Sequence, residues 1–327
     1  MIPKESKEIK RSLKVAVQMD EPYDLDKKTD STLALIEEAL KRNFIVFIYT
    51  VSNLYLSENM LLASAKRILK VDIRRKNFIE LDKEVNIELK KFDFVLVRQD
   101  PPFNMNYITA THLLEKVKSI TKILNDPNSI RNCPEKLFVM NFYNLMPPTS
   151  ITKSVKEIYK FLDTYKKIII KPLFGNGGKD VFFLNDKDPN KKVIIDKLLS
   201  DGQHIIVQKF LKKVTLGDKR ILLIDGEPVG AINRIPNKNE IRANLHIGAK
   251  AKKARLLPRD LQICKIIGPY LKSKGLFFAG IDIIDGKLTE INVTSPTCIR
   301  EIDFHNKTNI SEIFWNKALE LEQFKSV

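Results

Sequence analysis

Apolar runs and amphipathic stretches alternate along the first third of the chain. LKVAVQMD (13–20), FIVFIYT (44–50) and FDFVLVR (92–98) are short and apolar enough to form buried strands. Between the first two, LALIEEALKRN repeats its apolar residues every three or four positions, and Asp30-Ser31-Thr32 precedes it as an N-cap, so a helix is predicted. Strand, helix and strand in this order indicate a layered α/β domain. RQDPPF then forms a stiff loop at the carboxyl end of the third strand, where open α/β sheets bind ligands.

The pattern changes near residue 130, where we expect a domain boundary. CPEKLFVMNF predicts a helix started by a proline, and TSITKSVKEIYKFLDTY predicts a second helix with Thr149 or Ser150 near its cap. Three strands follow, at KKIIIKP (166–172), VFFLN (181–185) and HIIVQKFL (204–211), and the loop FGNGGKD links the first two.

The last third of the chain contains two Asp-Gly pairs inside apolar runs. ILLIDGEPVGAINR predicts a hairpin turned at Asp225-Gly226, and FFAGIDIIDGKLTEINV predicts another near Asp285-Gly286. Between them, IPNKNEIRANLHIGAKAKKARLLP is polar and has little periodicity, which indicates a mobile loop, and residues 258–274 follow as a helix.

The stretch TEINVTSPTCIRE (289–301) carries oxygen ligands on a strand pattern. Residues i and i+2 of a strand point the same way, so Glu290 and Asn292 share one face while Ile291 and Val293 share the other. A solvated outer face is the plain alternative. A carboxylate and an amide held together on a rigid element suit a hard cation, for which Mg²⁺ is the natural choice.

A third candidate ligand, Asp282, lies on the preceding strand, and its position depends on the turn. A two-residue loop at Asp285-Gly286 pairs Asp282 with Thr289 and places Asp282 and Glu290 on opposite faces. A three-residue loop from Ile284 to Gly286, with Gly286 in the left-handed conformation, shifts the register by one and sets Asp282 beside Glu290. We therefore predict the three-residue loop.

Glycines 175, 177 and 178 surround Asn176 in a loop between two predicted strands. Such a loop brings backbone N–H groups close to an anion, although a plain tight turn is the alternative. It is not a Walker A loop, because Asp180 stands where Ser or Thr should hold magnesium. Lys171 comes just before the loop on an apolar strand, which favours a role beside phosphates.

Composition limits the class of protein. Of 56 basic residues 43 are Lys and 13 Arg, and they are dispersed along the chain, so the net charge of +16 favours anionic small substrates over nucleic acid. The chain has no apolar run of membrane-spanning length, and its first residues have no apolar signal region, so we expect a cytoplasmic protein without membrane contact. Cys133, Cys264 and Cys298 form neither a disulfide framework nor a zinc pattern.

The motifs together resemble the ATP-grasp superfamily and, within it, bacterial-type glutathione synthetase. The resemblance rests on MD, DST, RQDPPF, SIRNCPEKLF, IIIKPLFGNGG, GDKR, DGEPV, RIP, RANL, GIDII and TEINVTSPTCIRE, which follow the family's order from about residue 13 to 320. It implies an α/β N-terminal layer followed by an ATP-grasp fold, whose two α+β subdomains hold ATP between them. The implied division is a flexible arm (1–12), a substrate-binding domain (13–132), a central subdomain (133–211) and a C-terminal subdomain (212–327) with a mobile loop (235–250).

The resemblance also implies a role for each site residue. Arg220 and Arg234 would be catalytic, and Asp282, Glu290 and Asn292 would hold two Mg²⁺ ions, which Mn²⁺ could replace. The ATP-binding residues would be Lys136, Lys171, Phe174, Gly175, Asn176, Gly177, Gly178, Gln208, Lys209, Phe210, Leu211 and Asp218. The substrate-binding residues would be Asp30, Ser31, Arg98, Asp100, Arg242, Asn244, Ser295, Thr297 and Arg300.

The activity implied is the ATP-dependent joining of γ-glutamylcysteine to glycine through an acyl phosphate, in a homotetramer. One alternative is another ATP-grasp carboxylate–amine ligase with a different acceptor or amine. Its support is the loop 235–250, which has a single glycine, Gly248, where the family is glycine-rich. A second alternative is a nucleotide-binding or nucleic-acid-binding protein without catalysis, supported by the positive charge alone. Cys298 lies inside the substrate motif, and we expect it to be a packing residue.

Overall fold

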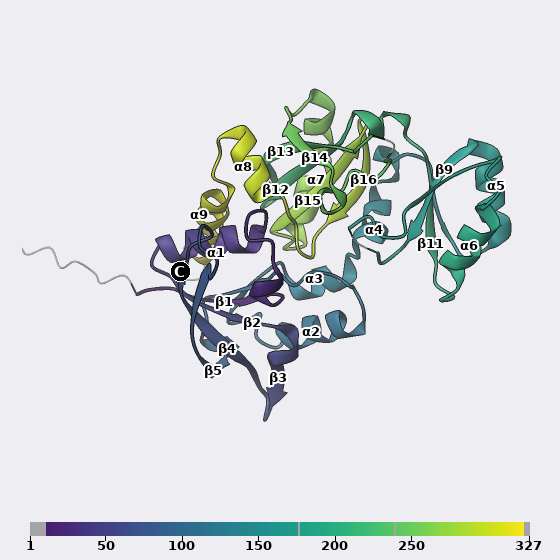
Figure 1. The fold of residues 1–327 in the computed structure, drawn as a ribbon. Helices are drawn as coiled ribbons and strands as arrows, with labels where there is room; N and C mark the ends of the chain where they lie inside the picture. The colour runs from purple at the N-terminus through teal and green to yellow at the C-terminus, as the bar shows by residue number, and fades with distance from the viewer. Residues whose placement is uncertain (1–10, 176, 239, 324–327) are drawn as a thin grey trace, which may run out of the picture.

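The computed structural model describes residues 11–175, 177–238 and 240–323, so most of the predicted arm and Asn176 lie outside the described residues. The chain folds into three sheets that follow one another in sequence (Figure 1). The first sheet lies on one side of the molecule with α1, α2 and α3, the second forms a separate lobe with α5 and α6, and the third lies between them.

The first sheet has seven strands in the order β3-β4-β2-β1-β6-β7, with β5 paired to β4. Strands β1, β2, β6 and β7 run parallel, while β3, β4 and β5 add an antiparallel ribbon. Its strands are β1 (Lys14–Gln18), β2 (Ile45–Tyr49), β3 (Leu54–Ser57), β4 (Met60–Val71), β5 (Ile79–Glu88), β6 (Phe94–Val97) and β7 (Lys122–Leu124). Its helices are α1 (Ser31–Lys41), α2 (Met105–Glu115) and α3 (Pro127–Asn132).

The predicted helix cap at Asp30 is confirmed, because its carboxylate accepts a hydrogen bond from the Leu33 amide at 2.6 Å.

The second sheet is a four-stranded antiparallel layer in the order β10-β9-β11-β8. Its strands are β8 (Thr149–Thr152), β9 (Lys167–Pro172), β10 (Phe182–Asn185) and β11 (Ile205–Lys209). Helices α5 (Val155–Tyr165) and α6 (Lys191–Leu199) cover it, and the short α4 (Glu135–Phe138) leads into it. Apolar side chains of α5 and α6 pack on Ile168, Ile170 and Val207, which gives this lobe its own small core.

The third sheet has the order β14-β13-β12-β15-β16 and is antiparallel throughout. Its strands are β12 (Asp218–Ile224), β13 (Glu227–Ile235), β14 (Lys250–Lys253), β15 (Phe278–Ile284) and β16 (Lys287–Asn292). Helix α7 (Pro258–Ser273) packs on one face, because Ile263, Ile267 and Leu271 join the core under the two hairpins.

The two last helices, α8 (Ile299–Asn306) and α9 (Ile310–Gln323), return to the first sheet, and α9 lies beside α1 (Figure 1). Trp315 is fully buried there, and its indole N–H donates to the Leu35 carbonyl at 2.9 Å. One apolar core therefore runs from the first sheet through these helices to the third sheet. That continuity fixes how the first sheet sits against the third.

Three elements differ from the sequence-based expectation. The ribbon β3–β5 was not anticipated, because β5 is largely exposed and lacks an apolar alternation. Thr149 and Ser150 lie on the edge strand β8, not at a helix cap; α5 begins later and is capped by the Ser154 side chain. Within the predicted loop 235–250 and just beyond it, β14 pairs with β13.

Candidate active site

A cleft of about 660 Å³ opens between the second and third sheets and reaches the loops of the first. Most residues chosen from the sequence line it. These are Asp30, Asp100, Lys136, Lys171, Gly175, Gly177, Gly178, Gln208, Lys209, Phe210, Leu211, Asp218, Arg220, Arg234, Arg242, Asn244, Asp282, Glu290, Asn292, Ser295 and Thr297. Residues that are far apart in sequence and that were chosen for their chemistry thus meet in one cleft. This cleft is therefore the candidate active site.

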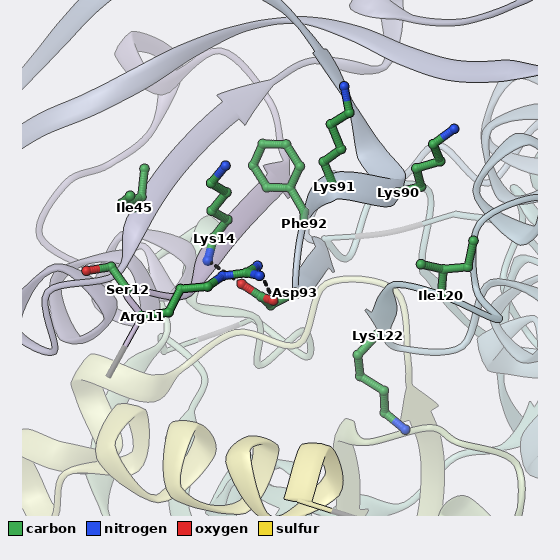
Figure 2. Close-up of a pocket in the computed structure, with 10 residues that line it drawn as sticks. All are labelled: Arg11, Ser12, Lys14, Ile45, Lys90, Lys91, Phe92, Asp93, Ile120 and Lys122. Carbon is green, nitrogen blue, oxygen red and sulfur yellow. Dashed lines mark hydrogen bonds and ion pairs between the residues drawn. The ribbon is translucent and has the colours of Figure 1, made fainter. Parts of the chain in front are cut away.

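A second hollow of about 670 Å³ lies at the opposite, amino end of the parallel strands (Figure 2). Asp93 lies at its centre and accepts hydrogen bonds from the Arg11 guanidinium at 2.9 Å and the Lys14 amide at 2.7 Å. The ammonium groups of Lys91 and Lys122 point in opposite directions (Figure 2), so the positive charges do not converge on one point. Its similar volume does not make this hollow a second reaction site.

The turn between β15 and β16, the hairpin that carries the predicted metal ligands, differs from the prediction. Ile284 pairs with Lys287, so the loop is the two-residue Asp285-Gly286, with φ of 52° and 69°. The predicted three-residue loop is therefore wrong. The register is nevertheless shifted, because Thr289 is an extra residue in β16.

The bulge at Thr289 aligns Asp282 with Glu290, which is the alignment that the three-residue loop was predicted to produce. Asp282 pairs directly with Glu290, and Gly280 pairs with Asn292. On the other face, Leu288 and Ile291 both enter the apolar core, which strict alternation along β16 would forbid. The bulge therefore places the three predicted metal ligands together on the cleft side.

Asp282 is held by two buried arginines from the neighbouring hairpin. Arg220 binds both carboxylate oxygens, with its Nη2 at 2.8 Å from Oδ2, and the Arg234 Nη2 lies 2.9 Å from the same Oδ2. Burial alone would raise the pKa of Asp282, but the two guanidinium groups outweigh it and hold that pKa well below its usual range. Gly280 leaves room for this contact, since a Cβ there would lie 3.2 Å from the Arg220 Cδ.

Asp218 also contacts Arg234, but its pKa shifts in the opposite direction from that of Asp282. Its Oδ2 lies 2.6 Å from the Arg234 Nη2, while Oδ1 is buried without a hydrogen-bond partner among the described residues. Burial raises the pKa of Asp218 to about 7, because Arg234 opposes the rise only in part and the charge of Asp282 adds to it. This carboxyl is thus poised to change its charge near neutral pH.

Lys136 joins the metal hairpin to the glycine loop. Its ammonium lies 3.1 Å from the Glu290 carboxylate and also donates to the carbonyl of Gly175. Burial would lower the pKa of Lys136, but the charges of Glu290 and Glu135 outweigh it and raise that pKa. Burial lowers the pKa of Lys171, whose ammonium lines the same wall. Both lysines bring positive charge to the cleft wall.

The glycine loop and the end of β11 form the second-sheet side of the cleft. Gly177 and Gly178 have φ of 60° and 79°, a left-handed conformation that glycine adopts without strain. Phe174 was expected to cover the phosphates, but its ring does not line the cleft; it is 40% exposed and stacks against Phe103.

Two predicted substrate residues support the loop after β16 and do not line the cleft. The Ser31 hydroxyl accepts a hydrogen bond from the Ile299 amide at 3.1 Å, and the Arg98 Nη2 donates to the Pro296 carbonyl at 2.9 Å. Both side chains are buried where the first sheet meets this loop, and neither lines the cleft. Their contacts support the loop, and their binding of substrate stays a prediction.

Arg300 is the third such residue. Its Nε donates to the Asp30 carbonyl at 3.0 Å, and its Nη2 lies 2.8 Å from the Glu37 carboxylate. Ser295 lines the cleft yet also donates to the Arg98 carbonyl at 3.2 Å. The motif SPTCIR therefore both joins the first sheet to the third and lines the cleft through Ser295, Thr297 and Cys298.

The oxygen donors suit a magnesium ion bound together with phosphate. Asp282, Glu290 and Asn292 offer two carboxylates and an amide on one face of β15 and β16. Within the described ranges, no group of three or more His, Cys, Asp or Glu side chains is close enough to hold a metal alone. An ion here needs further oxygen ligands, which agrees with the preference of Mg²⁺ for a few carboxylates plus phosphate oxygens.

Several residues of the cleft were missed from the sequence. Glu135 is held at the wall by the Thr294 hydroxyl, which donates to its carboxylate at 2.7 Å, and it was signalled only by its place beside Lys136. Cys298 also lines the cleft, but it is 4% exposed and burial raises the pKa of its thiol, which fits the expected packing role. The other missed residues are Asp24, Leu25, Asp26, Thr29, Pro101, Ile169, Pro172, Lys179, Val181, Val214, Ile241, Ala243, Leu245, Ile284, Thr289, Thr294 and Glu301.

Two α+β lobes that enclose a cleft lined by lysines, arginines and carboxylates are the arrangement of an ATP-grasp ligase. Solved structures share this fold. The D-cycloserine synthetase DcsG covers 93% of this chain and all of its own length with a TM-score of 0.61 at 14% identity. The D-alanine–D-alanine ligase from Bacillus anthracis, solved with ATP, covers 96% of this chain and all of its own with a TM-score of 0.58 at 14% identity.

The chain belongs to the prokaryotic glutathione synthetase family. The family's N-terminal domain matches residues 13–131, and its ATP-grasp domain matches residues 135–307. The glutathione synthetase of Brucella melitensis is 45% identical over 93% of this chain and 98% of the relative. That of Mesorhizobium japonicum is 44% identical over 93% and 97%, and that of Vibrio vulnificus 42% identical over 89% and 92%. The resemblance inferred from the motifs is confirmed.

Proposed function

We propose that this protein joins γ-glutamylcysteine to glycine with ATP and forms glutathione, ADP and phosphate. The observation that carries the proposal is one cleft that holds Lys136, Lys171, Arg220, Arg234 and the Asp282–Glu290 pair in a chain of this family. A γ-phosphoryl group needs this density of positive charge beside oxygen ligands for a cation.

The reaction has two steps. An oxygen of the cysteinyl carboxylate attacks the γ-phosphorus of ATP and displaces ADP, which forms an acyl phosphate. The neutral amine of glycine then attacks the acyl carbon, phosphate leaves, and the amine proton is lost to solvent. Both steps are dominated by positioning and charge neutralisation.

The roles of the arginines follow from their contacts. Arg220 and Arg234 are buried and fixed on Asp282 and Asp218, so their remaining N–H groups meet the charge that develops on the transferred phosphoryl and on the tetrahedral intermediate. A planar guanidinium fork suits these oxygens better than an ammonium group does.

Asp282, Glu290 and Asn292 would hold two Mg²⁺ ions, or Mn²⁺ in their place. When bound, the ions neutralise the charge of the phosphate oxygens. Lys136, Arg220 and Arg234 contact the same carboxylates and would face phosphate oxygens bound together with the ions.

The remaining ATP and substrate contacts are proposals on the same basis. Gly175, Gly177 and Gly178 support the phosphates, and the end of β11, from Gln208 to Leu211, receives the adenine. Asp30, Asp100, Ser295 and Thr297 hold the dipeptide together with Arg242 and Asn244, because all six line the cleft.

We further propose the division into domains 13–132, 133–211 and 212–327, supported by the three successive sheets, and a cytoplasmic homotetramer that binds neither nucleic acid nor membrane. No helix among the described residues is long and apolar enough to cross a membrane.

A coupled phosphate assay tests the function. Purified protein with ATP and Mg²⁺ should release phosphate only when both γ-glutamylcysteine and glycine are present, and the product should have the mass of glutathione. Phosphate release that needs a different acceptor or amine, or none at all, would reject the proposal. Salt-sensitive binding of RNA without turnover would favour a binding protein.

A further inference from the structure

The glycine loop is held over the cleft by contacts from three different parts of the chain. Among the residues that the structure describes, Lys136 donates to the Gly175 carbonyl, and the Arg242 Nη1 donates to the Gly178 carbonyl at 3.3 Å. The third contact is aromatic: the rings of Phe174 and Phe103 are stacked, with centroids 6.2 Å apart and planes 18° apart.

Phe103 differs from the other two partners because it does not line the cleft. Its ring lies in the loop RQDPPF of the first domain, 5.2 Å from the ring of Tyr107, which is buried in that domain's core. A small hollow between the two loops is bordered by Phe103, Phe174 and Pro101. Phe103 can therefore act on the reaction only through the loop that it contacts.

The Phe174 side chain is only partly covered by its surroundings. Its side chain is 40% exposed, while the neighbouring Leu173 is 7% exposed and anchors the start of the loop. For ATP to enter the cleft and for ADP to leave it, the glycine loop has to lift. This movement separates the rings of Phe174 and Phe103. Offset-stacked aromatic pairs of this geometry favour the joined state beyond the area they bury.

We propose that Phe103 is a positioning residue that latches the glycine loop shut over the transferred phosphoryl group. This inference rests on the proposed function. With the latch closed, water is excluded while the acyl phosphate waits for glycine. The stack also links loop closure to the first domain, which carries part of the dipeptide site, so the loop closes on a cleft whose acceptor end is already formed.

The test compares Phe103→Ala, Phe174→Ala and the double variant. Each single change should raise the KM for ATP by about 2- to 10-fold, as expected from the strength of one aromatic pair. Each should also raise the phosphate released per glutathione formed above the wild-type value of one, because water reaches the acyl phosphate. The double variant should be no worse than either single variant, since one contact is lost in all three.

Controls separate the latch from a structural role. Phe103→Tyr keeps the ring and should restore coupling, and Phe304→Ala, which removes a 70% exposed aromatic far along the chain, should leave both quantities unchanged. Phe174→Ala alters an exposed side chain, so it tests the same contact even if Phe103→Ala folds poorly. An unchanged KM and a ratio of one in Phe174→Ala, or additive effects in the double variant, would overturn the latch. A wild-type protein that makes no glutathione would instead overturn the proposed function.

Discussion

The two Asp-Gly hairpins of the third sheet have the same backbone design. Asp225-Gly226 and Asp285-Gly286 are both two-residue turns with positive φ at each residue, as type I′ turns require. The first hairpin has an extra residue, Val229, and the second has Thr289, each two pairs beyond its turn. Each turn aspartate is also tied by a lysine: Asp225 by Lys272 at 2.5 Å and Asp285 by Lys213 at 2.6 Å.

What differs is the charge that each hairpin presents to the cleft. The β12–β13 hairpin brings Arg220 and Arg234, and the β15–β16 hairpin brings Asp282 and Glu290. Because β12 and β15 are neighbours, Arg220 pairs with Asp282 across the ladder. Two hairpins with the same turn and bulge therefore set the arginines of β12–β13, the cationic row, beside the carboxylates of β15–β16, the anionic row. The opposite charges compensate each other, which lowers the cost of burying them.

The largest expected effect comes from removing the cationic row. Arg220→Ala should lower kcat by about 10³-fold, because it removes a group aimed at the developing charge and leaves Asp282 partly unpaired. Arg220→Lys should also impair turnover, since an ammonium cannot span both oxygens of Asp282. Steady-state kinetics check this. Lys213→Ala, which breaks an exposed pair at the other hairpin's turn, serves as the control, and near-normal kcat in Arg220→Lys would contradict the role.

The anionic row is broken by Glu290→Gln. The change removes one negative charge facing Lys136 and one proposed metal ligand, so we expect kcat to fall by about 10²-fold and the Mg²⁺ concentration for half-maximal activity to rise. Titration of activity against Mg²⁺ measures both. Glu227→Gln, at an exposed glutamate of the first hairpin, should leave the magnesium requirement unchanged. An identical metal dependence in both variants would remove Glu290 from the metal site.

The two turns should differ in their tolerance of a side chain. Both glycines have positive φ, so alanine should destabilise either fold by about 1 kcal/mol. At Gly226 a Cβ would also meet the Gly268 carbonyl oxygen at 2.5 Å, whereas at Gly286 it would meet the flexible Arg259 side chain at 3.3 Å. Gly226→Ala should therefore cost about 1–3 kcal/mol more than Gly286→Ala in urea denaturation. If the two variants lose equal amounts of unfolding free energy, α7 must move away from the first turn at no cost, and the predicted difference is wrong.

The smallest expected effect is a difference in pH dependence between the carboxylates. The pKa of Asp218 rises on folding from 3.8 to about 7, so its contribution to stability is complete below pH about 4 and is lost as the pH rises through about 7. The pKa of Asp282 is lowered, so its contribution is constant above pH about 4 and is lost below it.

Asp218→Asn should therefore flatten the fall in the free energy of unfolding between pH 5 and 8, relative to the wild type. Denaturation midpoints at several pH values in this range provide the measurement. Parallel curves for the two proteins would show that Asp218 keeps an ordinary pKa in the folded state.

Local rules were sufficient where the signal lay within a few residues. The Asp30 cap, the strands at 44–50 and 166–172 and the shared face of Glu290 and Asn292 all follow from spacing and side-chain chemistry. The ribbon β3–β5 was missed because β5 is largely exposed and has no apolar period to read, although β4 alternates buried and less buried residues at Leu61, Ala63 and Ala65. The strand β8 was mistaken for the start of a helix, although its β-branched Thr149, Ile151 and Thr152 suit an edge strand.

The sequence by itself determined the family, most of the order of the elements and the candidate side chains for the chemistry, because motif identity and short-range periodicity are properties of neighbouring residues. Only the tertiary structure decided the alignment of Asp282 with Glu290, since a bulge at Thr289 depends on which residues the core accepts on the far face. The tertiary structure also showed that Ser31, Arg98 and Arg300 form hydrogen bonds between the first domain and the segment after β16. Hydrogen-bond partners nearly 200 residues or more away leave no trace in local spacing, so their choice belongs to the packed fold.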